Sequence, residues 1–249
     1  MINFDFAQYC SGCSACHDVC PANAITMNFD REGFIMPEVS REKCINCGKC
    51  DKVCPHLNHE KISGTREDIK GVWLYSSDDD EAKMKSSSGA ACYELAKRFL
   101  EDGGFISGCV WDENFNAKHE TGKSYELLTR TQGSKYLQSD TRDIHREILE
   151  LLRNGERVLF SGTPCQANAI HNVIINEDEA LRENLITVAL ICHGVASPLA
   201  WKSFRELMTQ REKSKLISVN FRDKSQEGYK KSYCRYSFAN GNKISCSLL

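Results

Sequence analysis

Cysteines are the residues with the clearest chemistry in this chain. Eight of the fourteen lie between residues 10 and 54, in the runs CSGCSACHDVCP and CINCGKCDKVCP, which begin at residues 10 and 44. Every cysteine and the final proline of the first run recur in the second. A chain of 249 residues can bury a core without disulfides to stabilise it. The two runs therefore predict metal binding and not a disulfide framework.

Each run reads C-x2-C-x2-C-x3-C-P and resembles the cysteine run of two-cluster bacterial ferredoxins, which bind [4Fe-4S] clusters. Three closely spaced thiolates hold one side of a cluster, and the fourth ligand comes from the other run because the local chain cannot reach the far side. The resemblance therefore predicts two crossed ligand sets. The first is Cys10, Cys13, Cys16 and Cys54, and the second is Cys44, Cys47, Cys50 and Cys20.

Two zinc sites are the alternative, since zinc also accepts four cysteines. Zinc sites usually pair two separated C-x2-C units, whereas here three evenly spaced cysteines are followed by C-P, twice over. This pattern favours iron-sulfur clusters. Between the runs, AITMNFDREGFIMPEV alternates around a charged turn at residues 30–33 and predicts a β-hairpin. We therefore expect an α+β ferredoxin-like two-cluster module over residues 1–57.

The rest of the chain has a different pattern. Residues 58–70 are polar without an apolar period and predict a linker. From residue 71 onward, apolar strands alternate with amphipathic helices, which predicts an α/β domain with a mixed sheet over residues 71–249. GVWLYSS at 71–77 is expected to be its first strand, and GAACYELAKRFLEDGG at 89–104 a helix that ends at a glycine.

Two predicted strands run into loops that carry cysteine. The strand at 157–160 leads into SGTPCQ, and LITVALIC leads into His193. Open α/β sheets bind ligands beyond the carboxyl ends of their strands. Cys165 would also lie near a helix N-terminus, which favours the thiolate. His193 is the candidate acid or base because an imidazole titrates near neutrality, and a hydrogen-bonding role is the alternative.

Two further loops have the composition of phosphate sites. QGSKYLQSD, at 132–140, offers backbone and hydroxyl donors beside a lysine, and SSSGA, at 86–90, precedes a predicted helix. The amides of a helix N-terminus can hold a pyrophosphate. An ordinary helix cap and a plain surface lysine are the alternatives.

In order, FISGCVWDENF, QGSKYLQSD, VLFSGTPCQ and ICHGVASP resemble the family formed by the beta subunits of coenzyme F420 hydrogenases and dehydrogenases, over residues 71–225. The resemblance implies an iron-sulfur flavoprotein oxidoreductase. Its FAD exchanges a hydride with a diffusible carrier, a deazaflavin coenzyme or another, and single electrons with the clusters. The implied cofactor-binding residues are Ser88, Gly89, Gly133, Ser134, Lys135, Tyr136, Thr163 and Gln166. Cys165 and Cys192 are implied ligands of a further cluster.

The chain also departs from the family's pattern. Members usually continue beyond the point where this sequence stops, through a further cysteine group, and Cys234 and Cys246 do not form a short pair. We therefore expect the α/β domain to be incomplete at its C-terminus, with weak FAD binding and an incomplete third cluster. A ferredoxin-like electron-transfer or docking subunit without its own substrate site is the alternative function.

Composition bears on location and partners. The 32 lysines and arginines nearly balance the 34 aspartates and glutamates, for a net charge of -2, so nucleic acid is not an expected partner. The longest apolar stretch, residues 185–192, is too short to span a membrane, and no signal peptide is recognisable. The sequence predicts a cytoplasmic protein of the anaerobic type with a redox partner protein or a diffusible carrier.

Overall fold

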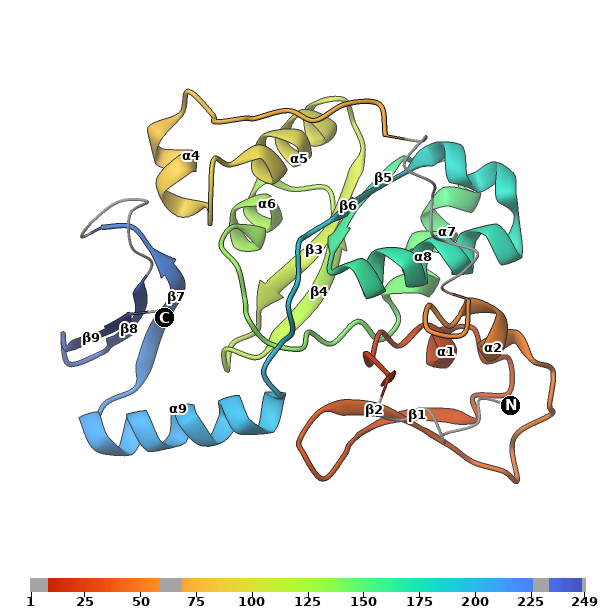
Figure 1. Cartoon of the computed structure of the whole chain (residues 1–249), viewed down its shortest axis with the longest axis horizontal. Coiled ribbons are helices and arrows are strands. Elements are labelled where there is room, and N and C mark those ends of the chain that lie inside the picture. The colour runs from red at the N-terminus through yellow and green to blue at the C-terminus, as the bar shows by residue number, and fades with distance from the viewer. Residues whose placement is uncertain (1–8, 59–68, 226–232, 248–249) are drawn as a thin grey trace.

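The computed structural model describes residues 9–58, 69–225 and 233–247. Figure 1 shows a cysteine-rich part at the N-terminus, a central α/β part and a separate antiparallel sheet near the C-terminus. Residues 59–68 of the expected linker lie outside the described residues. Among the described residues, no helix is long and apolar enough to cross a membrane.

The cysteine-rich part consists of two short helices and a hairpin. The helices are α1 (Ala15–Asp18) and α2 (Lys49–Val53), and the strands are β1 (Ile25–Phe29) and β2 (Ile35–Val39). The two strands pair antiparallel from Ile25 opposite Val39 to Phe29 opposite Ile35. In the turn, an Asp30 carboxylate oxygen accepts hydrogen bonds from the backbone nitrogens of Glu32 and Phe34. The predicted β-hairpin is confirmed.

The central part is a four-stranded sheet in the order β4-β3-β5-β6. Its strands are β3 (Phe105–Trp111), β4 (Ala117–Gly122), β5 (Val158–Gly162) and β6 (Leu185–Ala189). Strands β3, β5 and β6 are parallel, and β4 is antiparallel to β3. The predicted α/β fold with a mixed sheet is confirmed.

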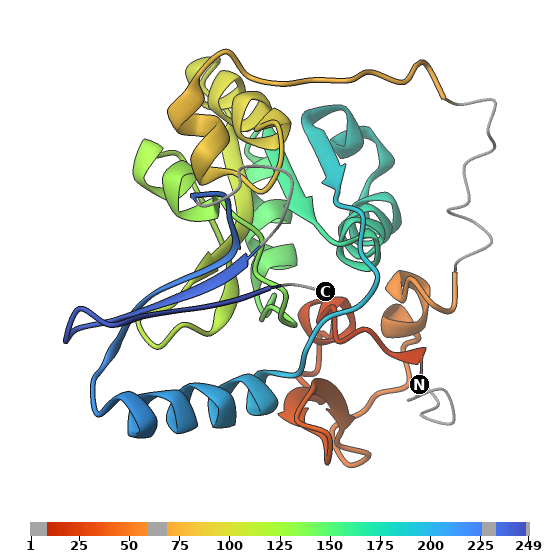
Figure 2. The ribbon, with the colours of Figure 1, turned by 60° about the vertical axis from the view of Figure 1, so that its left-hand side comes forward.

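Helices cover both faces of this sheet (Figures 1 and 2). They are α5 (Ala91–Glu101), α6 (Tyr125–Thr131), α7 (Ile144–Arg153), α8 (Pro164–Glu177) and the 3-10 helix η3 (Glu179–Asn184), and α4 (Asp80–Lys85) precedes α5 in the chain. Phe99 and Leu128 from α5 and α6 pack on one face, and Ile148 and Ile170 from α7 and α8 on the other. Each such buried side chain stabilises the fold by about 1.5–3 kcal/mol. The helix predicted at 89–104 is confirmed as α5.

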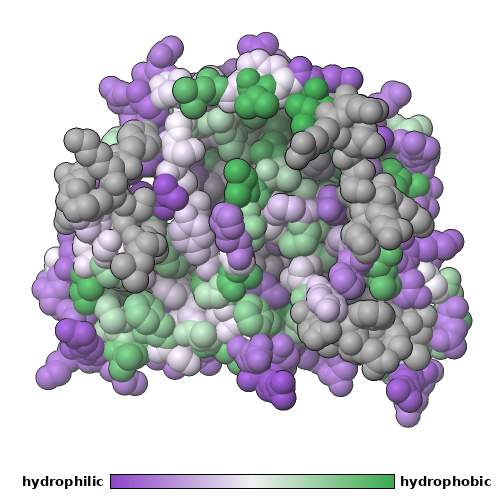
Figure 3. Space-filling model, in the orientation of Figure 1, coloured by the Kyte–Doolittle hydropathy of each residue, from purple (hydrophilic) through white to green (hydrophobic). Residues whose placement is uncertain are grey.

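The expectation of a strand at residues 71–77 is wrong. This segment is extended but pairs with no strand in the described part of the chain. Its apolar side chains are exposed, with Trp73 78% and Leu74 103% accessible. Figure 3 shows apolar atoms along the upper edge, over the course of this segment in Figure 1. Apolar residues in an extended pattern become a strand only where a neighbouring strand takes up the backbone hydrogen bonds.

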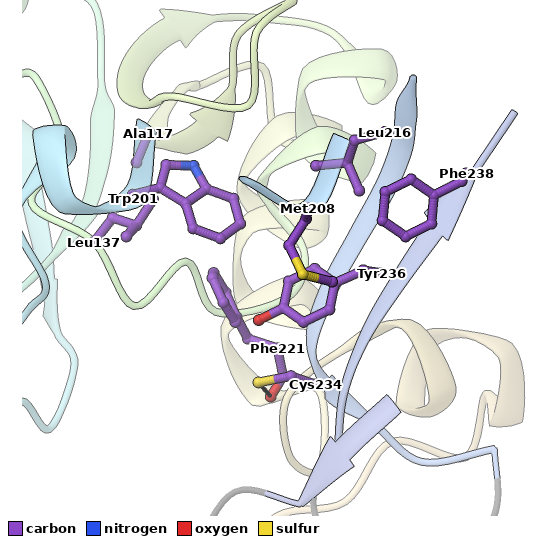
Figure 4. Close-up of a cluster of buried hydrophobic side chains, with 9 residues drawn as sticks. All are labelled: Ala117, Leu137, Trp201, Met208, Leu216, Phe221, Cys234, Tyr236 and Phe238. Atoms are coloured by element: carbon purple, nitrogen blue, oxygen red, sulfur yellow. Dashed lines mark hydrogen bonds between the residues drawn. The ribbon is translucent and has the colours of Figure 1, made fainter. Parts of the chain in front are cut away.

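The antiparallel sheet near the C-terminus is a feature that the sequence pattern did not predict. It contains β7 (Leu216–Asp223), β8 (Tyr233–Phe238) and β9 (Lys243–Ser247), preceded by α9 (Pro198–Glu212). Figure 4 shows Trp201 of α9 among side chains from this sheet. Its indole nitrogen donates to the carbonyl oxygen of Phe115 at 2.6 Å. In β8 and β9, Cys234 and Cys246 lie directly opposite each other.

Candidate iron-sulfur and cofactor sites

Four thiols from both cysteine runs gather beside α1. They are Cys10, Cys13, Cys16 and Cys54, which we call the inner cysteine set. Burial raises the pKa of the thiols of Cys10, Cys13 and Cys16, and for Cys13 to about 12. The negative charge that Cys54 would carry adds to the rise in all three. Cys54, from the second run, therefore lies with the first three cysteines of the first run.

The remaining four thiols line a single pocket. They are Cys20, Cys44, Cys47 and Cys50, which we call the outer cysteine set. Apolar side chains of the hairpin, Ile25 and Val39, form part of the same wall. The backbone nitrogen of Ala24 donates to the sulfur of Cys20 at 3.3 Å. Cys20 therefore lies with the second run.

Both sets have the chemistry that a four-iron cluster requires. Each offers four thiols converging from two chain segments, and a buried thiolate is costly without a nearby positive charge. Iron supplies that charge and favours the deprotonated ligand. Backbone N–H groups directed at the sulfurs, such as that of Gly12 toward Cys10 at 3.4 Å, are a feature that tunes such clusters. The residues present therefore fit two [4Fe-4S] clusters.

A buried carboxylate, which no sequence motif marks, joins α1 to α7. Asp18 accepts hydrogen bonds from the backbone nitrogens of Asp143 (2.9 Å) and His145 (3.1 Å), and its oxygens lie 2.6 Å and 2.8 Å from Nδ1 of His145 and His17. Burial would raise the pKa of Asp18, but these hydrogen bonds outweigh burial and lower it. Asp18 is therefore an anion that holds the dicluster part against the α/β part.

The loop QGSKYLQSD makes a second connection between the two parts. The Gln138 side chain accepts from the backbone nitrogen of Ile35 at 2.6 Å and donates to its carbonyl oxygen at 3.0 Å. Just beyond the loop, the Thr141 hydroxyl donates to the carbonyl oxygen of Cys13 at 2.9 Å. The hairpin and the inner cysteine set are thus both attached to the segment that follows α6.

The two predicted phosphate loops lie against each other. The backbone nitrogen of Ser134 donates to the Ser87 hydroxyl at 2.7 Å, and the two hydroxyl oxygens are also 2.7 Å apart. Gly133 has a φ of +76°, a conformation that favours glycine. A side chain at Gly89 would lie 2.4 Å from the carbonyl oxygen of Tyr75. The loops are therefore closely packed around small residues.

Two lysines approach these loops. Nζ of Lys135 donates to the carbonyl oxygens of Arg130 and Gln132, and burial lowers the pKa of Lys135 to about 8. Nζ of Lys224, which follows β7, donates to the carbonyl oxygen of Ser88 at 2.9 Å. Burial lowers the pKa of Lys224 as well. Lys224 was missed because it is distant in sequence from every loop motif.

A buried network fixes the start of α8. Gln166 accepts from the backbone nitrogen of Thr163 at 2.9 Å and donates to the Ser139 hydroxyl at 2.8 Å. His119 Nε2 lies 3.1 Å from the carbonyl oxygen of Ser161, so this nitrogen carries the proton, and Nδ1 accepts from Ser139. Burial lowers the pKa of His119 to about 4. The network is therefore uncharged at neutral pH and positions the Cys165 loop.

Cys165 faces the inner cysteine set. Its sulfur is 3.0 Å from the Thr163 hydroxyl, and the negative charge that a thiolate there would carry contributes, after burial, to the raised pKa of Cys10 and Cys13. Cys192 and His193 are instead exposed, on the segment that follows β6. This segment crosses the face seen in Figure 1, where Figure 3 shows the surface to be hollowed. A further cluster between Cys165 and Cys192 stays a prediction.

Tyr136 is joined to the segment that follows β6, because its carbonyl oxygen accepts a hydrogen bond from the backbone nitrogen of Ala196 at 3.2 Å. It is the remaining predicted cofactor contact, and its ring packs on Phe221 of β7, with centroids 5.8 Å apart. Its hydroxyl accepts a hydrogen bond from Arg222 at 3.3 Å. The C-terminal sheet therefore contributes to the surroundings of the QGSKY loop.

Comparison with known protein families agrees with both halves of this description. Residues 9–58 match the model of the 4Fe-4S dicluster domain. This part of the chain is therefore an iron-sulfur domain of the kind that holds two four-iron clusters. Residues 155–248 match the C terminus of the coenzyme F420 hydrogenase/dehydrogenase beta subunit, so this part of the chain is similar to that family. The resemblance drawn from the loop motifs is confirmed.

Individual relatives are distant. One of the subunits of the F(420)H(2) dehydrogenase of Methanosarcina mazei is 23% identical over 224 residues, which cover 86% of this chain and 60% of the relative. An uncharacterized protein of Methanocaldococcus jannaschii is 27% identical over 217 residues, which cover 74% and 59%. The chain thus spans about three fifths of the length of these relatives.

A solved structure is also similar. It is a chain of the F420-reducing [NiFe] hydrogenase complex of Methanosarcina barkeri, with 19% identity and a TM-score of 0.48. The similarity covers 71% of this chain and 61% of that chain.

Proposed function

We propose that this protein passes electrons between a flavin site on the α/β part and two four-iron clusters, with a diffusible hydride carrier as the substrate at the flavin. The observation that carries the proposal is the position of Cys165. Its loop follows the carboxyl end of β5, where α/β sheets bind ligands, and its thiol faces the inner cysteine set. Electron donor and acceptor sites would therefore be neighbours.

The inner and outer cysteine sets are the proposed cluster ligands. The contribution of Cys54 to the raised pKa values of the first-run thiols supports the inner set. The pocket shared by Cys20 and the second-run thiols supports the outer set. Crossed ligation would make each cluster a link between the two runs, so that losing one cysteine disturbs a single cluster.

The flavin-side residues would bind and orient the cofactor. FAD, when bound, supplies the conversion between hydride transfer and single-electron transfer. Gly133, Ser134 and the Ser88–Gly89 turn would offer backbone and hydroxyl donors, and Lys135 a positive charge, to its phosphates. Tyr136 and Thr163 would border the site, and the uncharged His119 network, through Gln166, would hold the Thr163 end in place. His193 would serve as acid or base at the substrate.

A purely electron-transferring protein without a flavin is the second candidate. The interactions of Lys135 and Gln166 with groups of this chain favour it, since in this conformation their polar atoms are engaged internally. In both cases we expect a cytoplasmic protein of anaerobic metabolism that works with a redox partner protein.

Metal and flavin analysis of the anaerobically purified chain tests the proposal. We expect about eight iron atoms per chain and acid-labile sulfide, because the cysteine runs are doubled. Added FAD should bind in equilibrium titration, and Lys135→Ala should weaken it. Zinc in place of iron would refute the clusters, and no FAD binding at any concentration would favour the second candidate.

A further inference from the structure

The two cysteine sets differ in their access to solvent. In the inner set, Cys13 and Cys16 are each 9% exposed, and Cys165 of the α/β part lies beside Cys10 and Cys13. In the outer set, Cys47 is exposed, and its neighbour Ile45 is 65% accessible. Electrons that leave the α/β part would therefore reach the inner cluster first and the molecular surface at the outer cluster.

The surface at the outer set is basic. We call residues 41–52 the outer face. They include four basic side chains, Arg41, Lys43, Lys49 and Lys52, and two acidic ones, Glu42 and Asp51. All four basic residues are exposed. Lys49 pairs with Glu177 at 3.5 Å, whereas within the described residues no carboxylate lies within 4.0 Å of the charged nitrogens of the other three.

These three unpaired positive charges lie close together in the chain, in a protein with a net charge of -2. Some other exposed basic groups pair with a carboxylate nearby, as Lys85 does with Glu81 and Arg130 with Glu120, and others, such as Lys215 and Lys243, have no such pair within the described residues. In sequence, the basic residues of the outer face lie on both sides of Ile45 and of the proposed cluster ligand Cys47, which are both exposed. An apolar contact beside unpaired charges of one sign is suited to a brief protein encounter in which charges steer the approach.

We propose that the outer face is the docking surface for an acidic electron-carrier protein. This inference rests on the proposed electron-transfer function and adds the partner and its place of contact. The reduced outer cluster would give one electron to the oxidised carrier, and no bond or proton changes. Carboxylates on the carrier would approach the unpaired basic groups, and Ile45 would be covered. Such encounters bury small areas and depend strongly on salt.

Binding of a defined acidic carrier to the full chain tests this proposal. The probe is an acidic two-cluster bacterial ferredoxin, and its dissociation constant is measured anaerobically by surface plasmon resonance at low and high salt. The test variant is Lys43→Glu with Lys52→Glu. The matched control is Lys215→Glu with Lys243→Glu, two exposed lysines near and in the C-terminal sheet. Both variants change the net charge equally.

We expect the outer-face variant to weaken ferredoxin binding at least about tenfold at low salt, and the control to change it less than about twofold. High salt should weaken ferredoxin binding by the unmodified chain, so that its dissociation constant approaches that of the outer-face variant. Equal losses in the two variants, or none in either, would overturn the proposal. So would equal affinity for a basic carrier such as a cytochrome c.

Iron and flavin counts on the same preparations separate this proposal from the function on which it rests. If a chain that carries clusters but no FAD binds ferredoxin, and the outer-face variant weakens this binding, the docking surface is supported and the flavin site is refuted. If the chain binds FAD, and the outer-face variant binds ferredoxin as tightly as the unmodified chain does, the flavin site is supported and the docking surface is refuted.

Discussion

Asp18 connects the dicluster part to the α/β part, and Asp18→Asn should loosen that connection without unfolding either part. The carboxylate is buried and accepts two backbone hydrogen bonds from the start of α7 and hydrogen bonds from two histidines. Asparagine keeps one acceptor oxygen and places an NH2 group where an acceptor is needed. The positive end of the α7 dipole also loses its anion.

The size of the effect follows from these contacts. A hydrogen bond to a charged group contributes about 1.5–3 kcal/mol, and asparagine would weaken or lose more than one of those that Asp18 accepts. We expect the opening of the α1–α7 contact to become easier by roughly 3 kcal/mol. Since about 1.4 kcal/mol is a factor of ten, amides protected by this contact should exchange roughly a hundredfold faster.

Hydrogen exchange of the anaerobic, cluster-loaded protein, followed by mass spectrometry, measures this opening segment by segment. Peptides from α1 and α7 should exchange faster, and peptides from α6 and β3 should not change. Asp143→Asn is the matched control, because Asp143 is exposed, its side chain pairs only with Arg146 among the described residues, and asparagine tolerates its φ of +67°. If the two variants exchange alike, the carboxylate of Asp18 does not hold the two parts together.

Three other predictions concern the clusters, the buried histidine and the flavin site. Cys20→Ala should remove the electron paramagnetic resonance signal of the outer cluster alone, and Cys54→Ala that of the inner cluster alone; the reverse result would refute the crossed pairing. Burial lowers the pKa of His119 from 6.5 to about 4. Between these two pH values the unfolded chain binds a proton that the folded chain does not. The free energy of unfolding therefore decreases as the pH drops from 6.5 to about 4, by roughly 3 kcal/mol in full. His119→Gln should abolish this contribution to the pH dependence of stability, measured by hydrogen exchange of the β5 and α8 amides. If the pH dependence does not change in the variant, another group causes it. Lys135→Ala should weaken FAD binding about ten- to a hundredfold in a fluorescence titration, through loss of one charge-assisted hydrogen bond, and unchanged affinity would put the phosphate site elsewhere.

Much of this protein could be predicted from local sequence. The doubled C-x2-C-x2-C-x3-C-P run predicted the dicluster domain because ligand spacing is set by the cluster that the thiolates surround. The alternation around residues 30–33 predicted the hairpin, and apolar patterns predicted α5 and the strands β5 and β6. Each of these signals lies within a few residues, where side-chain spacing and backbone geometry are coupled directly.

Packing between distant segments decided the rest. GVWLYSS has an apolar pattern, yet it forms no strand in the described structure because a strand needs a neighbour, which local sequence does not specify. Asp18, Gln138 and His119 had no motif, and their roles come from partners far away in sequence. The approach of Cys165 to Cys10, and so the order of the proposed electron path, likewise exists only once the dicluster part is packed on the α/β part. Sequence therefore determined which groups can bind metal, and tertiary packing determined which of them lie inside and which reach the surface, because burial depends on the whole chain.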